Sequence, residues 1–270
     1  MTGCGTAMLT ASPVGRPSSS VSTAATRAPS PALPSRAARD AARADTSPVV
    51  VVGLGDSVTA GSACGCTTFV DLYAAMLHQR SGRSAAAANF GKPGLTSTGL
   101  SEQLADPQVR AQLAKATLVV VTIGANDLEP LIGRWQAAGC DASCVDPATT
   151  AMGANVSTAL AQVRAAASPR TRVLVTNYWN VFEDGDVGEQ DYGKAFHAWS
   201  DGVTRSANDH ICAAAAAAGD TCVDIYEPFE GAGDRNPTAL LAGDGDHPNA
   251  AGHQLIAEAL IQAEPLNQES

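Results

Sequence analysis

The stretch Pro48-Val-Val-Val-Val-Gly-Leu-Gly-Asp-Ser-Val-Thr-Ala-Gly61 decides the fold, because an apolar run passes directly into a turn of small residues that holds a serine. The four valines are β-branched and do not alternate with polar residues, a pattern typical of a central parallel strand buried on both faces. Gly53 and Gly55 allow the chain to turn sharply. Ser57 is therefore expected at the carboxyl end of that strand, the edge where open parallel sheets bind their ligands.

The rest of the chain alternates between apolar runs and helical patterns. Further strands are expected at 83–90, 118–123, 172–177 and 221–226. Helices are expected at 67–80, 98–116 with a break near Asp106-Pro107, 148–167, 192–218 and 248–262, with a loop-rich insertion at 178–191. This alternation predicts an α/β fold, a three-layer flavodoxin-like sandwich with a central five-stranded parallel sheet.

Three more short motifs follow the first one along the chain. They are Asn89-Phe-Gly-Lys-Pro-Gly94, Gly124-Ala-Asn126-Asp127 and Asp244-Gly-Asp-His247-Pro248-Asn249. Gly-Asp-Ser alone is an ordinary turn sequence, so the interpretation depends on the whole set. Together the four motifs resemble the signature blocks of the SGNH, or GDSL, hydrolase superfamily, in the family's order. The resemblance covers the chain from about residue 48 to about residue 263.

The resemblance implies a catalytic triad in which Ser57 is the nucleophile, His247 the general base and Asp244 the residue that orients the base. A serine hydroxyl needs such a base, and the base must be held in the right tautomer. Asp246, next to His247, is a rival for the orienting role, although adjacent side chains usually diverge and the motif points to Asp244. The other histidines lie in predicted helices and are interpreted as structural: His78, His197, His210 and His253.

The resemblance also implies an oxyanion hole made of the backbone N–H groups of Ser57 and Gly94 and the side-chain amide of Asn126. Without the other motifs, Gly94 would be interpreted as a turn glycine and Asn126 as a helix cap. A dinucleotide fingerprint fails at the first motif, because Val58 stands where the third glycine belongs. Neither a metal nor a cofactor is expected to take part in the chemistry.

The expected function is that of a serine esterase, which hydrolyses carboxylic esters of short or medium acyl chains, or lipid esters, through an acyl-enzyme. Carbohydrate O-acetyl ester hydrolysis is an alternative, since family members also deacetylate sugars. A non-catalytic cell-wall-binding relic of the fold should lack a motif residue, and none is missing; an interaction protein displayed on a tether is a further alternative. Apolar residues that could line the substrate site, or simply pack in the core, are Leu95, Leu128, Trp135, Trp179 and Phe182.

Residues 1–47 differ from the rest, since they are rich in Ala, Ser, Pro, Thr and Arg and show no hydrophobic periodicity. They are expected to form a disordered tether ahead of one domain at 48–265. The formal net charge is -10, and five arginines against two aspartates make the first 47 residues positive, so the domain is the acidic part. This charge disfavours nucleic acid or an anionic surface as partner. No apolar run is long enough to cross a bilayer, and a monomer is expected.

The cysteines indicate an oxidising compartment. Cys4 is preceded by Thr2-Gly3, which resembles the end of a bacterial lipoprotein cleavage site, but no apolar signal segment precedes it, and a chance tripeptide is the other interpretation. The remaining six pair by position, Cys64 with Cys66, Cys140 with Cys144 and Cys212 with Cys222, although connectivity stays open. Zinc is the competing interpretation, but these spacings lack the usual two-residue knuckle. We expect a secreted or cell-surface protein, with Cys4 as a candidate lipid anchor.

Overall fold

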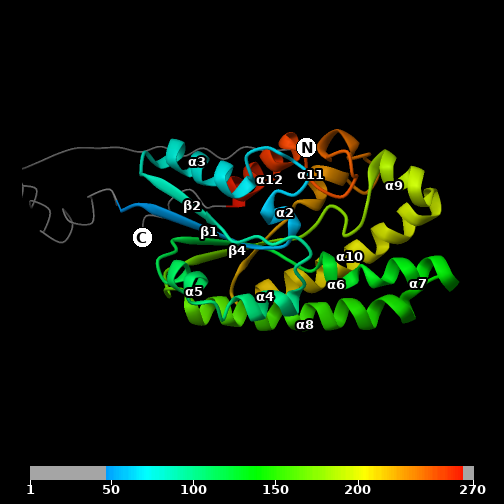
Figure 1. The fold of residues 1–270 in the computed structure, drawn as a ribbon, viewed down its shortest axis with the longest axis horizontal. Coiled ribbons are helices and arrows are strands. Elements are labelled where there is room, and N and C mark those ends of the chain that lie inside the picture. Colours follow the sequence, from blue (N-terminus) through cyan, green and yellow to red (C-terminus); the bar gives the residue numbers. More distant parts are fainter. Residues whose placement is uncertain (1–46, 264–270) are drawn as a thin grey trace, which may run out of the picture. The chain divides into compact units, whose positions relative to one another are not determined.

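The computed structural model describes residues 47–263. The tether and Cys4 therefore lie outside the described residues, apart from Ser47, and what the sequence suggests about them remains a prediction. The sheet has five parallel strands in the order β2-β1-β3-β4-β5 (Figure 1). They are β1 (Val49–Gly55), β2 (Ala85–Asn89), β3 (Leu118–Thr122), β4 (Arg172–Thr176) and β5 (Thr221–Val223). This order confirms the flavodoxin-like layout.

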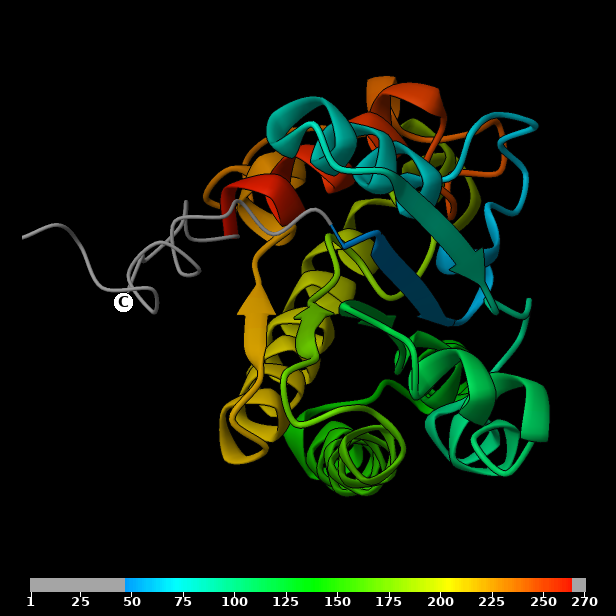
Figure 2. The ribbon, with the colours of Figure 1, turned by 90° about the vertical axis from the view of Figure 1, so that its left-hand side faces the viewer.

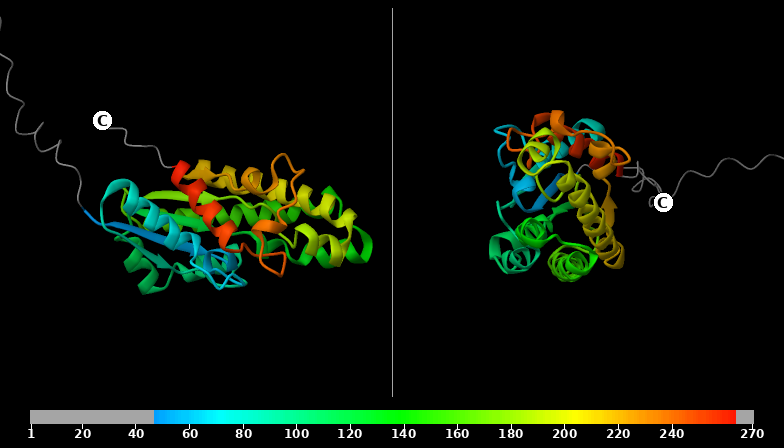
Figure 3. Two further views of the ribbon diagram at one scale, coloured as in Figure 1. Left: turned by 90° about the horizontal axis from the view of Figure 1, so that it is seen from above. Right: turned by 90° about the vertical axis from the view of Figure 1, so that its right-hand side faces the viewer.

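The helices alternate with the strands along the chain. They are α2 (Ser57–Ala60), α3 (Phe69–Ser81), α4 (Ser97–Gln103), α5 (Pro107–Leu113), α6 (Ala125–Leu128), α7 (Pro130–Ala138), α8 (Ala142–Ala166), α9 (Gly185–Tyr192), α10 (Lys194–Ala217), α11 (Tyr226–Glu230), the 3-10 turn η1 (Thr238–Leu240) and α12 (Ala250–Ala263). Helices α3 and α12 cover one face of the sheet, and α4, α5 and α8 cover the other (Figure 2). Helix α10 lies beside α8 (Figure 3).

The strands β1 and β3 occupy the middle of the sheet and end together. Gly55 at the end of β1 is in register with Thr122 at the end of β3. Both strands are almost entirely buried, in keeping with their unbroken valine runs. As a result, the segments that follow the two strands, α2 and α6, begin at the same edge of the sheet.

Several element boundaries differ from those expected. The fifth strand ends at Val223, and α11 begins at Tyr226. The reason is that the side-chain oxygen of Asn177 accepts hydrogen bonds from the backbone N–H groups of Ile225 and Tyr226, at 2.6 and 3.2 Å. Helix α8 begins at Ala142, well before residue 148, because Asp141 caps it and Pro147 is accommodated inside it.

The insertion expected to be rich in loops is partly helical. Asp184 accepts a hydrogen bond from the N–H of Gly185 at 2.7 Å, and α9 starts there. The two short helices that follow β3, which are α6 and α7, were also not expected from the sequence.

The expected cysteine pairs are disulfides in the structure: Cys64–Cys66, Cys140–Cys144 and Cys212–Cys222. The ligand atoms of Cys64, Cys66 and His253 lie within 4.8 Å of one another. Because the two sulfurs are bonded to each other, they do not offer a thiolate pair to zinc in this oxidised form. Within residues 47–263, none of the helices has the length and hydropathy of a membrane span.

Candidate active site

The turn after β1 places Ser57 at the edge of the sheet. Gly55 has a φ of 145°, and an added Cβ there would collide with the carbonyl oxygen of Thr122, so only glycine fits. The N–H of Asp56 donates to that same carbonyl at 3.2 Å. The Asp56 carboxylate then accepts from the N–H of Val58 at 3.0 Å and caps α2. Ser57 is thereby the first helical residue after the strand.

The second motif lies directly against α2. Asn89 donates from its side-chain amide to the carbonyl of Thr59 at 2.7 Å, and its side-chain oxygen accepts from the N–H of Gly91 at 2.9 Å. A side chain at Gly91 would collide with the backbone of Ala60. Gly94, with a φ of 73°, follows this close contact and has open space where a Cβ would be.

The third motif is hydrogen-bonded to the segment that follows the second. The Asn126 amide donates to the carbonyl of Leu95 at 2.9 Å, and the Asp127 carboxylate accepts from the N–H of Ser97 at 2.8 Å. Asn126 is not used as a helix cap, because Gly124 precedes α6 and no side chain caps that helix. A primary amide has two N–H groups. One of them is therefore left for a second acceptor near Ser57.

The last motif holds its histidine by several hydrogen bonds. Nδ1 of His247 lies 2.8 Å from Oδ2 of Asp244, and Oδ1 of Asp244 accepts from the N–H groups of Asp246 and His247 at 3.1 Å each. Partial burial opposes ionisation of Asp244, but the hydrogen bonds outweigh it and lower the pKa of this carboxyl overall. The nearest oxygen of Asp246 lies farther from Nδ1, at 3.7 Å. The geometry thus favours Asp244 as the partner of His247.

A cleft of about 240 Å³ opens beside Ser57. Of the residues assigned to the site from the sequence, Ser57 and Asn126 line this cleft, whereas His247, Asp244 and Gly94 do not. Within residues 47–263, no hydrogen bond joins Ser57 to the His247 ring. Catalytic hydrogen bonds commonly tighten only when substrate binds. The roles of these five residues remain predictions.

Tyr178 and Asp56 are site residues that the sequence reasoning missed. Both are buried, both line the cleft, and the Tyr178 hydroxyl donates a hydrogen bond to Oδ2 of Asp56. Burial raises the pKa of Asp56 to about 7, although the hydrogen bond from Tyr178 acts to lower it. A signal was present, because Tyr178 comes two residues after the end of β4 and therefore lies at the same sheet edge as Ser57.

The cleft is lined by acidic and aromatic side chains. Glu129, Glu183 and Asp246 contribute carboxyl groups, and no lysine, arginine or histidine is among the lining residues. Burial, followed by the charges of Asp191, Asp246 and Asp244, raises the pKa of Glu183. The aromatic lining residues are Tyr178, Trp179, Phe182 and Tyr192. The cleft therefore presents a negative potential to whatever enters it.

The five apolar residues considered for the substrate site fall into two groups. Trp179 and Phe182 line the cleft. Leu128 is fully buried, Leu95 packs against the core, and Trp135 packs in an aromatic cluster with Phe196 and Trp199. Core packing is the observed role of the second group, and Trp179 and Phe182 also belong to the buried core.

The histidines interpreted as structural have local partners. His253 is fully buried, and its Nδ1 accepts from the N–H of Phe69 at 3.3 Å. Nδ1 of His197 lies 3.2 Å from Asp184. Nδ1 of His78 lies 2.7 Å from the carbonyl oxygen of Arg83. For these three, each contact is one that holds elements of the fold together.

Comparison with known proteins adds a family and a fold. The model of the GDSL-like lipase/acylhydrolase family matches residues 54–255, whereas the curated proteins gave no match. The lipase Lip_vut3 from a goat rumen metagenome superposes with a TM-score of 0.69 at 22% identity, over 82% of this chain and 100% of that one. Axe2, an acetylxylan esterase from Geobacillus stearothermophilus, superposes with a TM-score of 0.55 at 19% identity, over 81% and 95%. At such identities the likeness establishes the fold.

Proposed function

Since the chain belongs to the GDSL-like lipase/acylhydrolase family and is an ester hydrolase, we propose that it is a serine esterase that forms an acyl-enzyme on Ser57. One observation carries this proposal. Ser57 and the amide of Asn126 line the same cleft at the carboxyl edge of the sheet, where β1 and β3 end together. A nucleophile and a donor for the developing oxyanion are thus available to one bound ester.

In the proposed reaction, Oγ of Ser57 attacks the ester carbonyl while His247 takes its proton. Asp244 accepts a hydrogen bond from Nδ1–H of His247, which leaves Nε2 free to act as the base. The carbonyl oxygen becomes negative and accepts from the N–H groups of Ser57 and Gly94 and from the second N–H of Asn126. His247 then gives the proton to the leaving alcohol, and a water molecule releases the acid by the same steps.

The lining of the cleft supports a substrate whose alcohol part is neutral or cationic. Carboxyl groups of Glu129, Glu183 and Asp246 disfavour an anionic lipid headgroup and would speed the departure of a carboxylate product. Trp179 and Phe182 border the cleft but are only 1% and 3% exposed, so a short acyl chain would contact the edges of these rings.

Carbohydrate O-acetyl ester hydrolysis is the second candidate. The observation in its favour is the number of acceptor groups in the cleft, because sugar hydroxyls can donate hydrogen bonds to Glu129, Glu183 and Asp246. The structural neighbour Axe2 is described as an acetylxylan esterase, which is consistent with this candidate.

The test is a comparison of p-nitrophenyl esters from acetate to palmitate, together with acetylated xylan, for the wild type and Ser57→Ala. We expect short and medium esters to be hydrolysed and the variant to lose turnover while its far-UV circular dichroism is unchanged. Intact-mass spectrometry should detect an acyl adduct on Ser57 with a slow substrate. Full activity in a folded Ser57→Ala protein would rule the proposal out.

We also propose a secreted or cell-surface location. The three disulfides support an oxidising compartment, since such bonds are rare in the cytosol. Non-reducing peptide mapping of protein isolated from the culture medium and the cell envelope tests both the location and the pairing.

A further inference from the structure

A stripe of polar side chains runs along one side of α10. Ser200, Thr204 and Asn208 are spaced by four residues, so they lie on the same side of the helix. They are buried, although other buried positions of α10 hold apolar residues such as Val203 and Ile211. A buried polar group costs free energy unless hydrogen bonds replace its lost hydration. The stripe is therefore expected to have specific partners.

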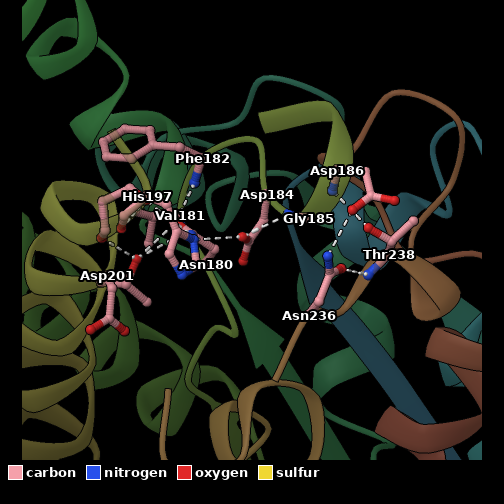
Figure 4. Close-up of polar contacts among 12 residues, drawn as sticks. Asn180, Val181, Phe182, Asp184, Gly185, Asp186, His197, Asp201, Asn236 and Thr238 are labelled. Atoms are coloured by element: carbon pink, nitrogen blue, oxygen red, sulfur yellow. Dashed lines mark hydrogen bonds and ion pairs between the residues drawn. The ribbon is translucent and has the colours of Figure 1, made fainter. Parts of the chain in front are cut away.

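The partners of the stripe lie in the segment that follows β4 and forms one wall of the cleft. Residues 178–183 all line the cleft. The N–H of Val181 donates to the hydroxyl of Thr204 at 3.1 Å. That hydroxyl also lies 3.0 Å from the side-chain oxygen of Asn180, which accepts from the N–H of Phe182 at 3.2 Å (Figure 4). Side chains of α10 thus hold this wall in place.

The side chain of Asn208 binds both backbone groups of Tyr178, the residue nearest the turn that holds Ser57. Its Oδ1 atom accepts from the N–H of Tyr178 at 2.9 Å, and its Nδ2 atom donates to the carbonyl of Tyr178 at 2.8 Å. The asparagine amide offers an acceptor and a donor in one plane. The two bonds together therefore fix the orientation of the Tyr178 backbone as well as its position.

The side chain of Tyr178 in turn reaches the residue next to Ser57. Tyr178 is buried, and its hydroxyl donates to Oδ2 of Asp56. The N–H of Asp56 donates to the carbonyl of Thr122 at 3.2 Å, and its Oδ1 atom accepts from the N–H of Val58 at 3.0 Å. Tyr178 thus supplies a third contact to the residue that precedes Ser57. A shift of the Tyr178 backbone would be passed through Asp56 to Ser57.

We propose that Asn208 is a positioning residue for the nucleophile, and that it acts on Ser57 through Tyr178 and Asp56. The inference rests on the proposed function, because it concerns the reactivity of the Ser57 hydroxyl. Asn208 does not line the cleft, so its role is not a contact with the substrate. Its contribution should appear in kcat, since a displacement of about 1 Å at a reacting group can cost on the order of 10²-fold in rate.

The experiment is a double-mutant cycle between Asn208→Asp and Tyr178→Phe, with kcat and KM measured on p-nitrophenyl acetate. Asp has the shape of Asn and keeps the acceptor for the Tyr178 N–H, but at pH 8 it lacks the donor to the carbonyl. Phe keeps the ring and loses only the hydroxyl that binds Asp56. We expect each single variant to lower kcat by roughly tenfold or more with KM within about twofold, and the double variant to be no slower than the slower single variant.

Thr171→Val is the matched control for a loss of stability. Thr171 is buried, and its hydroxyl donates to the carbonyl of Ala116 at 2.7 Å. It precedes β4, so it lies at the opposite edge of the sheet from Ser57. The variant should have a lower melting temperature than the wild type but the same kcat, because it loses a buried hydrogen bond that has no connection to the cleft. Asn208→Ala repeats the cycle without a new charge, and it replaces Asn208→Asp if that variant does not fold.

A second measurement follows the nucleophile directly. Phenylmethylsulfonyl fluoride reacts with an activated serine, whose oxygen displaces fluoride from sulfur, and the adduct is followed by intact-mass spectrometry. We expect Ser57 to be sulfonylated in the wild type and in Thr171→Val, and roughly tenfold more slowly in Asn208→Asp. A wild type that is not sulfonylated at Ser57 would overturn the proposed function, and this inference with it.

Three results would overturn the inference alone. If Tyr178→Phe keeps the wild-type kcat, or if the losses of the two single variants multiply in the double variant, Asn208 does not act through Tyr178. If Ser57 is sulfonylated equally fast in the wild type and in Asn208→Asp, Asn208 does not position the nucleophile. If Thr171→Val loses as much kcat as Asn208→Asp, the loss follows stability and not the position of Ser57.

Discussion

The hydroxyl of Tyr178 donates a hydrogen bond to Oδ2 of Asp56, the residue immediately before Ser57. The pair joins the end of β4 to the turn after β1, and both side chains are buried beneath the cleft. Asp56 also caps α2 through its other oxygen. A carboxyl group in this position affects both the stability of the fold and the position of Ser57 at the start of α2.

The first prediction concerns the pH dependence of stability. Burial raises the pKa of Asp56 from 3.8 to about 7, so between these values the folded protein binds more protons than the unfolded chain. Stability from this group is therefore present below about pH 4 and is lost as pH rises through 7. Asp56→Asn should show a smaller fall in melting temperature between pH 4 and 8 than the wild type.

The control for that experiment is Asp106→Asn, because Asp106 is also an aspartate cap but is exposed. Its pH profile should match that of the wild type. Parallel profiles for Asp56→Asn and the wild type would show that Asp56 is ionised at low pH in the folded protein.

The second prediction separates the two carboxylates beside His247. Asp244→Asn should lower kcat by up to on the order of 10⁴-fold, because the amide stabilises the wrong tautomer of the imidazole. Asp246→Asn should have a much smaller effect, since its carboxylate lies 3.7 Å from Nδ1 instead of 2.8 Å. Steady-state kinetics on a p-nitrophenyl ester measure both. The reverse ranking would assign the orienting role to Asp246.

The third prediction concerns Asn126. Asn126→Ala should lower kcat by on the order of 10²–10³-fold with little change in KM, because an oxyanion donor acts mainly in the transition state. The variant also loses the hydrogen bond to Leu95, so its melting temperature must be measured on the same preparation. Normal kcat in a destabilised variant would mean that the amide serves only to hold the segment at Leu95 in place.

The fourth prediction uses the charge of the cleft. Acetylthiocholine should have a kcat/KM at least about tenfold above that of its neutral isostere S-(3,3-dimethylbutyl) thioacetate, and the ratio should fall at high salt. Glu183→Gln should reduce the ratio, whereas Glu102→Gln, which changes an exposed glutamate on α4, should not. Equal rates for the two thioesters would show that Glu183 and its neighbours do not select the alcohol part.

The sheet was predictable because its signals are local. Short continuous runs of β-branched valines, as in β1 and β3, favour buried strands, and the glycines after them mark the turns. The shared location of Ser57 and Asn126 was predictable because each follows the end of a central strand, and parallel strands end at one edge of the sheet. The pair Tyr178 and Asp56 could have been inferred by the same rule.

Other features depend on contacts between distant parts of the chain. The fifth strand ends where the side chain of Asn177 accepts hydrogen bonds from two backbone N–H groups. The buried carboxyl groups of Asp184 and Glu230 lie within hydrogen-bonding reach of each other although the residues are far apart in sequence, and neither lies in a pattern that points to the other. Whether a carboxyl group is buried against another cannot be predicted from composition or periodicity.

The contact between α9 and the last motif sets the order in which heating should inactivate the protein. Gly245 has a φ of 69°, and an added Cβ there would lie 2.6 Å from Val187 on α9, so the loop carrying His247 lies directly against that helix. Helix α9 packs mainly against α10 and η1. Local unfolding of such peripheral elements takes less free energy than global unfolding. The protein should therefore lose its catalytic geometry at temperatures where its sheet is still intact.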